Sequence, residues 1–86
     1  MEEHNPHLKE VILEIVSNQL SSNNPPETKE TLDRLISEGY SKQDAKEYIG
    51  AVLSAHIAEI LSEEHEFDEP KFIKDLKNLP VLPWEE

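Results

Sequence analysis

The chain is predicted to be all-α, a compact bundle of three main helices with a short fourth helix and an extended C-terminal tail. Two features predict this class: apolar residues recur at helical spacing, and residues that begin or cap helices recur along the chain. A third is the 36% content of hydrophobic residues, which separates this chain from a disordered acidic tail of similar charge. A chain of this size buries only roughly 60 to 65% of its unfolded surface, so it forms one small core at most. We therefore expect a single helical domain over 1–86, with helices at about 6–22, 25–38, 42–64 and 70–78 and a tail over 79–86.

Proline and polar residues mark the first two helices. Asn5 is a favoured N-cap residue, and Pro6 suits the first helical position because its missing N–H has no partner there. The polar run 21–24 is typical of a loop, and Pro25-Pro26 begins a second helix with an acidic first turn. Each helix is thus predicted by a start signal as well as by periodicity.

The third helix is predicted to be the centre of the bundle. Gly39 supplies the left-handed residue that ends the second helix, with Tyr40 as its apolar contact, and Ser41 and Asp44 form a near capping box. The third helix then carries two faces that together cover most of its circumference. The large apolar face consists of Tyr48, Ile49, Val52, Leu53, His56 and Ile60, and the small-residue face of Gly50, Ala51, Ser54, Ala55 and Ala58.

A charged connector and a proline-rich tail complete the chain. The segment 63–69 is too charged for a core and lacks the ligand spacing of a calcium loop, which favours a solvated turn. Pro70 begins the short fourth helix, and Pro80 stops it. Trp84 in the tail is either a clamp that closes over the bundle or an exposed ligand for a partner. The clamp is preferred, because a lone tryptophan in a small domain is more often packed.

Composition excludes several classes of partner. Nineteen acidic residues against eight basic ones give a net charge of −11, which repels phosphate backbones and anionic lipid headgroups. We expect neither nucleic acid nor a membrane as a partner, since no apolar run approaches the roughly 20 residues that cross a bilayer. The first residues lack the basic and apolar parts of a signal peptide. The chain has no cysteine for a disulfide, a thiolate metal site or a nucleophile, and a soluble, cytoplasmic protein is the simplest expectation.

No complete reactive site can be written from the sequence, and we expect no catalytic residues and no cofactor. His56 and Glu59 lie one turn apart on the third helix. They could be a general base with its orienting carboxylate, but the preferred interpretation is a core histidine whose hydrogen bond is satisfied by a carboxylate. His4 and His7 have a spacing that can hold a transition metal, but exposed histidines near a terminus are the simpler interpretation. No metal site is favoured, and its weak candidates are His7, Glu10, His56 and Glu59.

Several short motifs occur in an order that resembles an uncharacterised family of small bacterial helical domains, a domain of unknown function. The resemblance covers roughly Asn5 to Leu79. The motifs are Asn5-Pro6-His7-Leu8, Asn18-Gln19-Leu20, Pro25-Pro26-Glu27, Thr31-Leu32-x-Arg34-Leu35, Gly39-Tyr40-Ser41, Asp44-Ala45 and Ile49-Gly50-x-Val52-Leu53.

The resemblance implies a metal held between two helices, through a His-x-x-x-His pair on the first and another at the start of the third. This chain has Lys9 and Leu13 at the first pair of positions and Gln43 and Glu47 at the second. A protonated lysine and a leucine cannot bind a metal. We therefore predict an interhelical ion pair between Lys9 and Glu47, with packing as the main stabilising contribution.

The leading functional hypothesis is a non-catalytic module that binds another protein, with self-association through an apolar edge as a variant. The alternative is metal binding or metal-dependent catalysis by a rearranged His/Glu set. A third hypothesis, that the carboxylates after Ile60 engage a basic partner, is less favoured than a solvated face that aids solubility.

Overall fold

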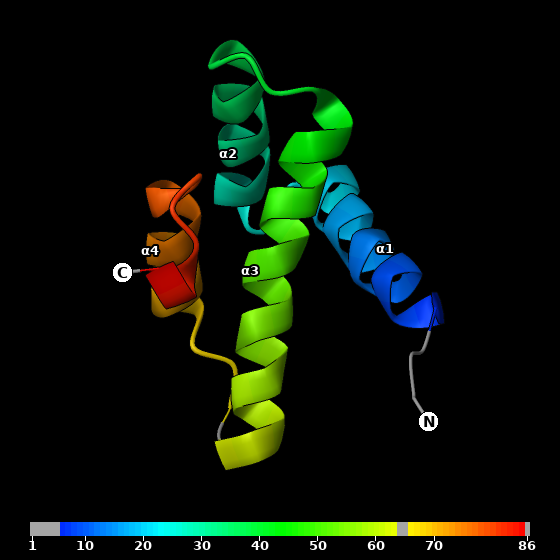
Figure 1. Cartoon of the computed structure of the whole chain (residues 1–86), viewed down its shortest axis with the longest axis vertical. Coiled ribbons are helices and arrows are strands. Elements are labelled where there is room, and N and C mark those ends of the chain that lie inside the picture. The colour runs from blue at the N-terminus through cyan, green and yellow to red at the C-terminus, as the bar shows by residue number, and fades with distance from the viewer. Residues whose placement is uncertain (1–5, 64–65, 86) are drawn as a thin grey trace.

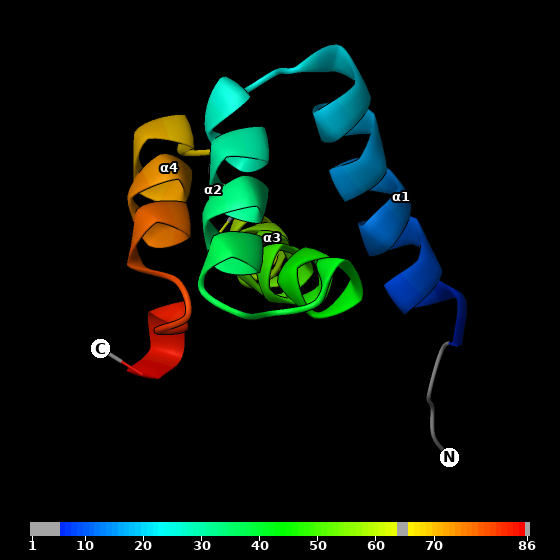
Figure 2. The ribbon, with the colours of Figure 1, turned by 90° about the horizontal axis from the view of Figure 1, so that it is seen from above.

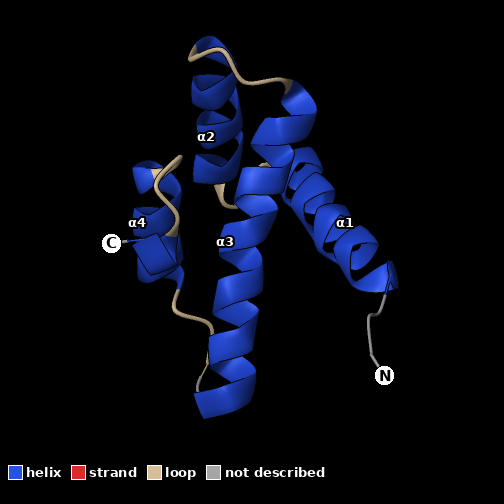
Figure 3. Cartoon of the chain, viewed as in Figure 1, coloured by secondary structure: helices blue, strands red, loops and turns tan. Residues whose placement is uncertain are grey.

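The computed structural model describes residues 6–63 and 66–85, with side chains from Leu8 onward (Figure 1). Its described residues form helices and loops without strands, which confirms the predicted all-α class (Figure 3). The predicted boundaries differ by a residue or so from the observed ones. The elements are α1 (Pro6–Ser22), α2 (Pro26–Ser37), α3 (Lys42–Glu63), α4 (Glu69–Asn78) and a single 3-10 turn, η1 (Pro83–Glu85).

The helix ends are built by the residues that predicted them. Gly39 has a φ of 108°, and the Tyr40 N–H donates to the Leu35 carbonyl at 3.1 Å while the Gly39 N–H donates to the Ile36 carbonyl at 3.0 Å. These two bonds are the Schellman pattern that satisfies the last carbonyls of α2. The predicted cap Asn5 lies outside the described residues.

Side chains cap the N-termini of α3 and α4. The Ser41 hydroxyl accepts a hydrogen bond from the Asp44 N–H at 3.0 Å at the start of α3. Asp68 accepts one from the Lys71 N–H at 3.2 Å and caps α4. The Ser41 cap fixes the start of α3 after the α2 turn, and the Asp68 cap fixes the start of α4 at the end of the charged connector.

The third helix runs the length of the molecule and packs against each of the other three helices (Figure 1). Helices α2 and α4 lie side by side on one flank, and α1 lies on the opposite flank, as the view in Figure 2 also shows. The core forms where these layers meet. Its buried apolar side chains are Ile12, Val16, Leu32, Leu35, Ala45, Ile49, Val52, Leu53, Phe72, Leu76 and Leu79.

Helix α1 packs against the small-residue face of α3 at Gly50. A Cβ added to Gly50 would lie 3.2 Å from the Ile12 Cγ2 and 3.5 Å from the Leu13 Cδ2, so the absent side chain lets the helices approach closely. Ser54 and Ala58, farther along the same face, are exposed. The prediction that neighbours cover both faces of α3 therefore holds only for its N-terminal half.

Two contacts join the C-terminal part to the bundle. The Arg34 guanidinium of α2 donates to the Leu76 carbonyl of α4 at 3.1 Å, which satisfies a carbonyl at the end of that helix. The predicted extended tail is wrong at its end, where η1 forms. There the Leu82 N–H donates to Glu85 Oε1 at 3.0 Å and the Glu85 N–H donates to the Leu82 carbonyl at 2.9 Å. This reciprocal capping gives the turn its shape.

None of the helices in the described part of the chain combines the length needed to cross a bilayer with sufficient apolar character.

Candidate functional site

A pocket of about 300 Å³ lies between α3, α4 and η1 and gathers residues from all three elements. We call it the tryptophan pocket. It is lined by Ala55, Glu59, Lys71, Asp75, Pro83 and Trp84. Three of the residues singled out in the sequence, His56, Glu59 and Trp84, lie in or behind it.

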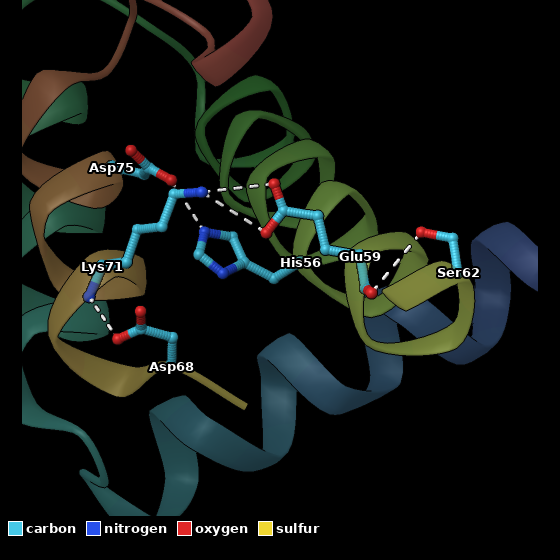
Figure 4. Close-up of polar contacts among 6 residues, drawn as sticks. All are labelled: His56, Glu59, Ser62, Asp68, Lys71 and Asp75. Carbon is cyan, nitrogen blue, oxygen red and sulfur yellow. Dashed lines mark hydrogen bonds and ion pairs between the residues drawn. The ribbon is translucent and has the colours of Figure 1, made fainter. Parts of the chain in front are cut away.

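The wall behind this pocket is fixed by a buried hydrogen bond between α3 and α4 (Figure 4). His56 Nε2 lies 2.7 Å from Asp75 Oδ2, and the two residues are only 3% and 5% exposed. A carboxylate can only accept, so the Nε2 of His56 carries the proton in this bond. The pair satisfies two polar groups that would be costly to bury alone, and it joins the two helices.

The expected pairing of His56 with Glu59 is wrong. Glu59 reaches instead to Lys71 on α4, whose ammonium lies 3.2 Å and 3.4 Å from its two carboxylate oxygens (Figure 4). The two side chains of α3 point in different directions. His56 points into the interface with α4, whereas Glu59 is more exposed and meets the ammonium of Lys71. The core-histidine interpretation of His56 remains, with Asp75 as its carboxylate.

The ion pair with Glu59 also determines the chemistry of Lys71. The hydrogen bonds and negative charge of Glu59 raise the pKa of Lys71, with smaller contributions from Asp75 and Asp68. A lysine that acts as a general base or nucleophile needs a lowered pKa, which is the opposite shift. The pocket lining also contains no serine, threonine or cysteine. The tryptophan pocket therefore presents fixed charges and an aromatic ring.

The structure contradicts the preferred prediction that Trp84 is a clamp. Trp84 is 62% exposed, and the side chain that packs against the core from this segment is Leu82. The start of the turn at Pro83 explains the difference, because the chain turns back after Leu82 and carries the indole to the rim of the pocket. Trp84 thus remains in its second predicted role, as a candidate contact for a partner.

A second pocket, of about 350 Å³, lies on the other side of Leu82. We call it the tyrosine pocket, and it is lined by Tyr40, Asp44, Glu47, Tyr48, Ala51 and Leu82. The two tyrosine rings are 5.4 Å apart between centroids and inclined at 78°. This edge-on pair is a favourable aromatic geometry, and it forms one wall of the pocket beside two carboxylates.

The predicted interhelical pair lies at the edge of the tyrosine pocket. Lys9 Nζ is 3.1 Å from Glu47 Oε2, and the Gln43 side-chain amide donates to the same carboxylate at 2.9 Å. The hydrogen bond from Gln43, followed by the hydrogen bond and charge of Lys9, lowers the pKa of Glu47. Lys9 of α1 and Gln43 of α3 therefore both contact the carboxylate of Glu47.

We expect a double-mutant cycle of Lys9→Met and Glu47→Gln to give a small coupling energy that favours the pair. Lys9→Met should also raise the pKa of Glu47, measured by NMR titration of its carboxyl carbon, while the Gln43 bond keeps part of the shift. Because the folded pKa is lowered, this contribution to stability is complete above the unfolded pKa and is lost as the pH falls through the folded pKa. A coupling energy of zero would remove the ion pair as a contact that holds α1 to α3.

The weak metal candidates do not assemble in the part of the chain whose side chains are described. His56 is buried against Asp75, Glu59 pairs with Lys71, and Glu10 is an exposed residue of α1. Among the described residues, no group of three histidine, aspartate or glutamate side chains could hold a metal ion. The side chain of His7, and His4 entirely, lie outside them.

Asp75 and Lys71 are the site residues that the sequence analysis missed. Asp75 follows Phe72 by three residues and precedes Leu79 by four, so helical spacing places it on the buried face of α4. A carboxylate at such a position needs a buried polar partner, and His56 was the available one. Asp75 was not predicted because a charged residue is not expected on the buried face of a helix.

Comparisons of the chain with models of protein families, with curated proteins and with solved structures found no match. The resemblance to a family of bacterial helical domains stays a prediction from the sequence.

Proposed function

We propose that this protein is a small, cytoplasmic, non-catalytic module that binds another protein through the surface around Trp84. The observation that carries the proposal is the exposure of Trp84, 62%, at the rim of the tryptophan pocket. Tryptophan is enriched among the residues that dominate binding energy at protein interfaces, where a rigid apolar ring fills a partner's pocket.

The setting of Trp84 supports this role. The turn that carries it is held by Leu82, which packs against the core, and by the reciprocal bonds between Leu82 and Glu85. The ring is therefore presented on a supported turn and little ordering is needed on binding. Val81, 46% exposed, is a second exposed apolar side chain of the same C-terminal segment.

We expect Trp84→Ala to abolish capture of a partner from an extract of the source cells while leaving stability within about 0.5 kcal/mol, because an exposed side chain contributes little to folding. Leu61→Ala is the matched control, since Leu61 is 76% exposed near the end of α3 and lines none of the described pockets. The captured protein, once purified, should shift the emission of Trp84 to shorter wavelengths. Trp84 is the chain's one tryptophan, so the emission of Trp84→Ala mixed with the same partner supplies the background to subtract.

Two outcomes would contradict the proposal. One is retention of the partner by Trp84→Ala, and the other is its equal loss with Leu61→Ala. Analytical ultracentrifugation of the purified chain separates the self-association variant, in which the exposed apolar residues Leu8 and Val11 of α1 would hold a second copy. A dimer that persists in Trp84→Ala would favour that variant.

A further inference from the structure

Consecutive residues of the C-terminal segment line the two pockets. Leu82 lines the tyrosine pocket, and the next two residues, Pro83 and Trp84, line the tryptophan pocket. A peptide that contacts Trp84 is therefore within reach of the tyrosine pocket. The chemistry of that second pocket indicates what kind of partner fits.

Each pocket combines aromatic rings with an excess of negative charge. In the tyrosine pocket, Asp44 and Glu47 contribute two carboxylates, and Lys9 supplies one ammonium group to Glu47. In the tryptophan pocket, Glu59 and Asp75 face one ammonium, that of Lys71. Aromatic faces and carboxylates both attract cations, so both pockets suit a positively charged side chain.

Asp44 is the carboxylate available to a ligand. It is exposed, and within the described part of the chain it forms no ion pair, whereas Glu47 already has Gln43 and Lys9 as partners. It also lies in the same pocket as the edge-on rings of Tyr40 and Tyr48. A cation at this place would contact an aromatic surface and an uncompensated carboxylate together.

The positive charges of α3 are directed elsewhere. Lys42 and Lys46 lie two positions either side of Asp44, which places them about 200° away around the helix. Together with Lys29 they line a separate pocket of about 310 Å³ whose lining contains no carboxylate. The helix thus keeps its lysines away from the tyrosine pocket, in a chain whose net charge of −11 already attracts basic partners.

We propose that the partner presents a basic segment, with an arginine side chain seated in the tyrosine pocket against Tyr40, Tyr48 and Asp44 and a neighbouring part of the segment on Trp84. This rests on the proposed function, and it names the chemistry of the partner. Arginine fits better than lysine because its planar guanidinium stacks on aromatic rings and bonds a carboxylate through two N–H groups.

The test uses the full chain and synthetic peptides of equal length that alternate glycine with arginine, lysine, glutamine or glutamate. Trp84 emission measures binding, and NMR shifts of the backbone amides locate it. We expect the arginine peptide to bind with strong salt dependence, to perturb Asp44 and Tyr48, and to bind more tightly than the lysine peptide. The glutamine and glutamate peptides should not bind.

Asp44→Lys should weaken binding of the arginine peptide about tenfold or more, whereas Glu30→Lys, the same charge change at an exposed residue of α2 that lines neither pocket, should weaken it less than about twofold. Tyr40→Leu keeps the apolar contact at the end of α2 and should weaken binding without any change of charge. Circular dichroism checks that each variant is folded, and Tyr40→Leu keeps the test decisive if Asp44→Lys is not.

Three results would overturn the basic-segment proposal: no binding of the arginine peptide, equal effects of Asp44→Lys and Glu30→Lys, or unchanged binding by Tyr40→Leu. If a partner is still captured through Trp84, the proposed function survives and only the chemistry of the partner is wrong. If capture is insensitive to Trp84→Ala, the proposed function itself fails.

Discussion

We expect Asp75→Ala to lower the free energy of unfolding by about 3 to 5 kcal/mol, because it leaves His56 buried without its hydrogen-bond acceptor. Asp75 and His56 are 5% and 3% exposed and bonded at 2.7 Å, so the lost carboxylate leaves a buried imidazole N–H without its protein partner. In a chain of this size the loss should lower the melting temperature by more than about 10 °C. Urea unfolding followed by circular dichroism measures the free energy of unfolding, and thermal unfolding measures the melting temperature.

Two variants separate this mechanism from a general effect of removing charge. Glu59→Ala removes a carboxylate from the same pocket, but from a half-exposed ion pair. It should lower the free energy of unfolding by only a small fraction of the decrease expected for Asp75→Ala. The double substitution of His56→Leu with Asp75→Leu should cost less than the two single changes together, since it removes both polar partners. Equal destabilisation by Asp75→Ala and Glu59→Ala would contradict a buried anchor.

The sequence was sufficient for the helices because their signals are local. Gly39 and Ser41 each act within a few residues of their own position, and each forms the expected cap. Such caps can be predicted because neighbours in the chain determine them. The predicted place of Lys9 opposite Glu47, on another helix, followed from a helical face and a resemblance.

The partners within the site were harder to predict because they depend on how helices approach one another. His56 is hydrogen-bonded across the interface of α3 and α4 to Asp75, which is 19 positions away in the chain. Helical periodicity within α3 alone favours Glu59, which is three positions away. The packing of Trp84 was predicted wrongly for a related reason. The prediction rested on how often a tryptophan is packed in a small domain, which carries no information about the turn at Pro83. Both errors concern side-chain direction in three dimensions.

The aromatic contacts of Phe72 should be as important to α4 as the hydrogen bond of Asp75. Phe72 is fully buried, and its ring lies 5.5 Å from that of His56 at 84° and 5.3 Å from that of Phe67. We expect Phe72→Ala to lower the free energy of unfolding by about 3 to 5 kcal/mol, through lost burial and the cavity left behind. A chain of 86 residues has a total stability of roughly 4 to 13 kcal/mol, so much of it would be lost.

Phe67→Ala is the matched control, since it removes the same ring from the same cluster at a position that is 42% exposed. It should cost less than about half as much, because the ring already contacts water in the folded state. Native-state hydrogen exchange gives a second measurement: in Phe72→Ala the amides of α4 should lose more protection than those of α2. Because α4 carries Lys71 and Asp75, the same variant should weaken partner binding at temperatures where the chain is still largely folded. Equal effects of the two substitutions, or uniform loss of protection across the bundle, would show that Phe72 stabilises the whole core and has no particular role in holding α4 to α3.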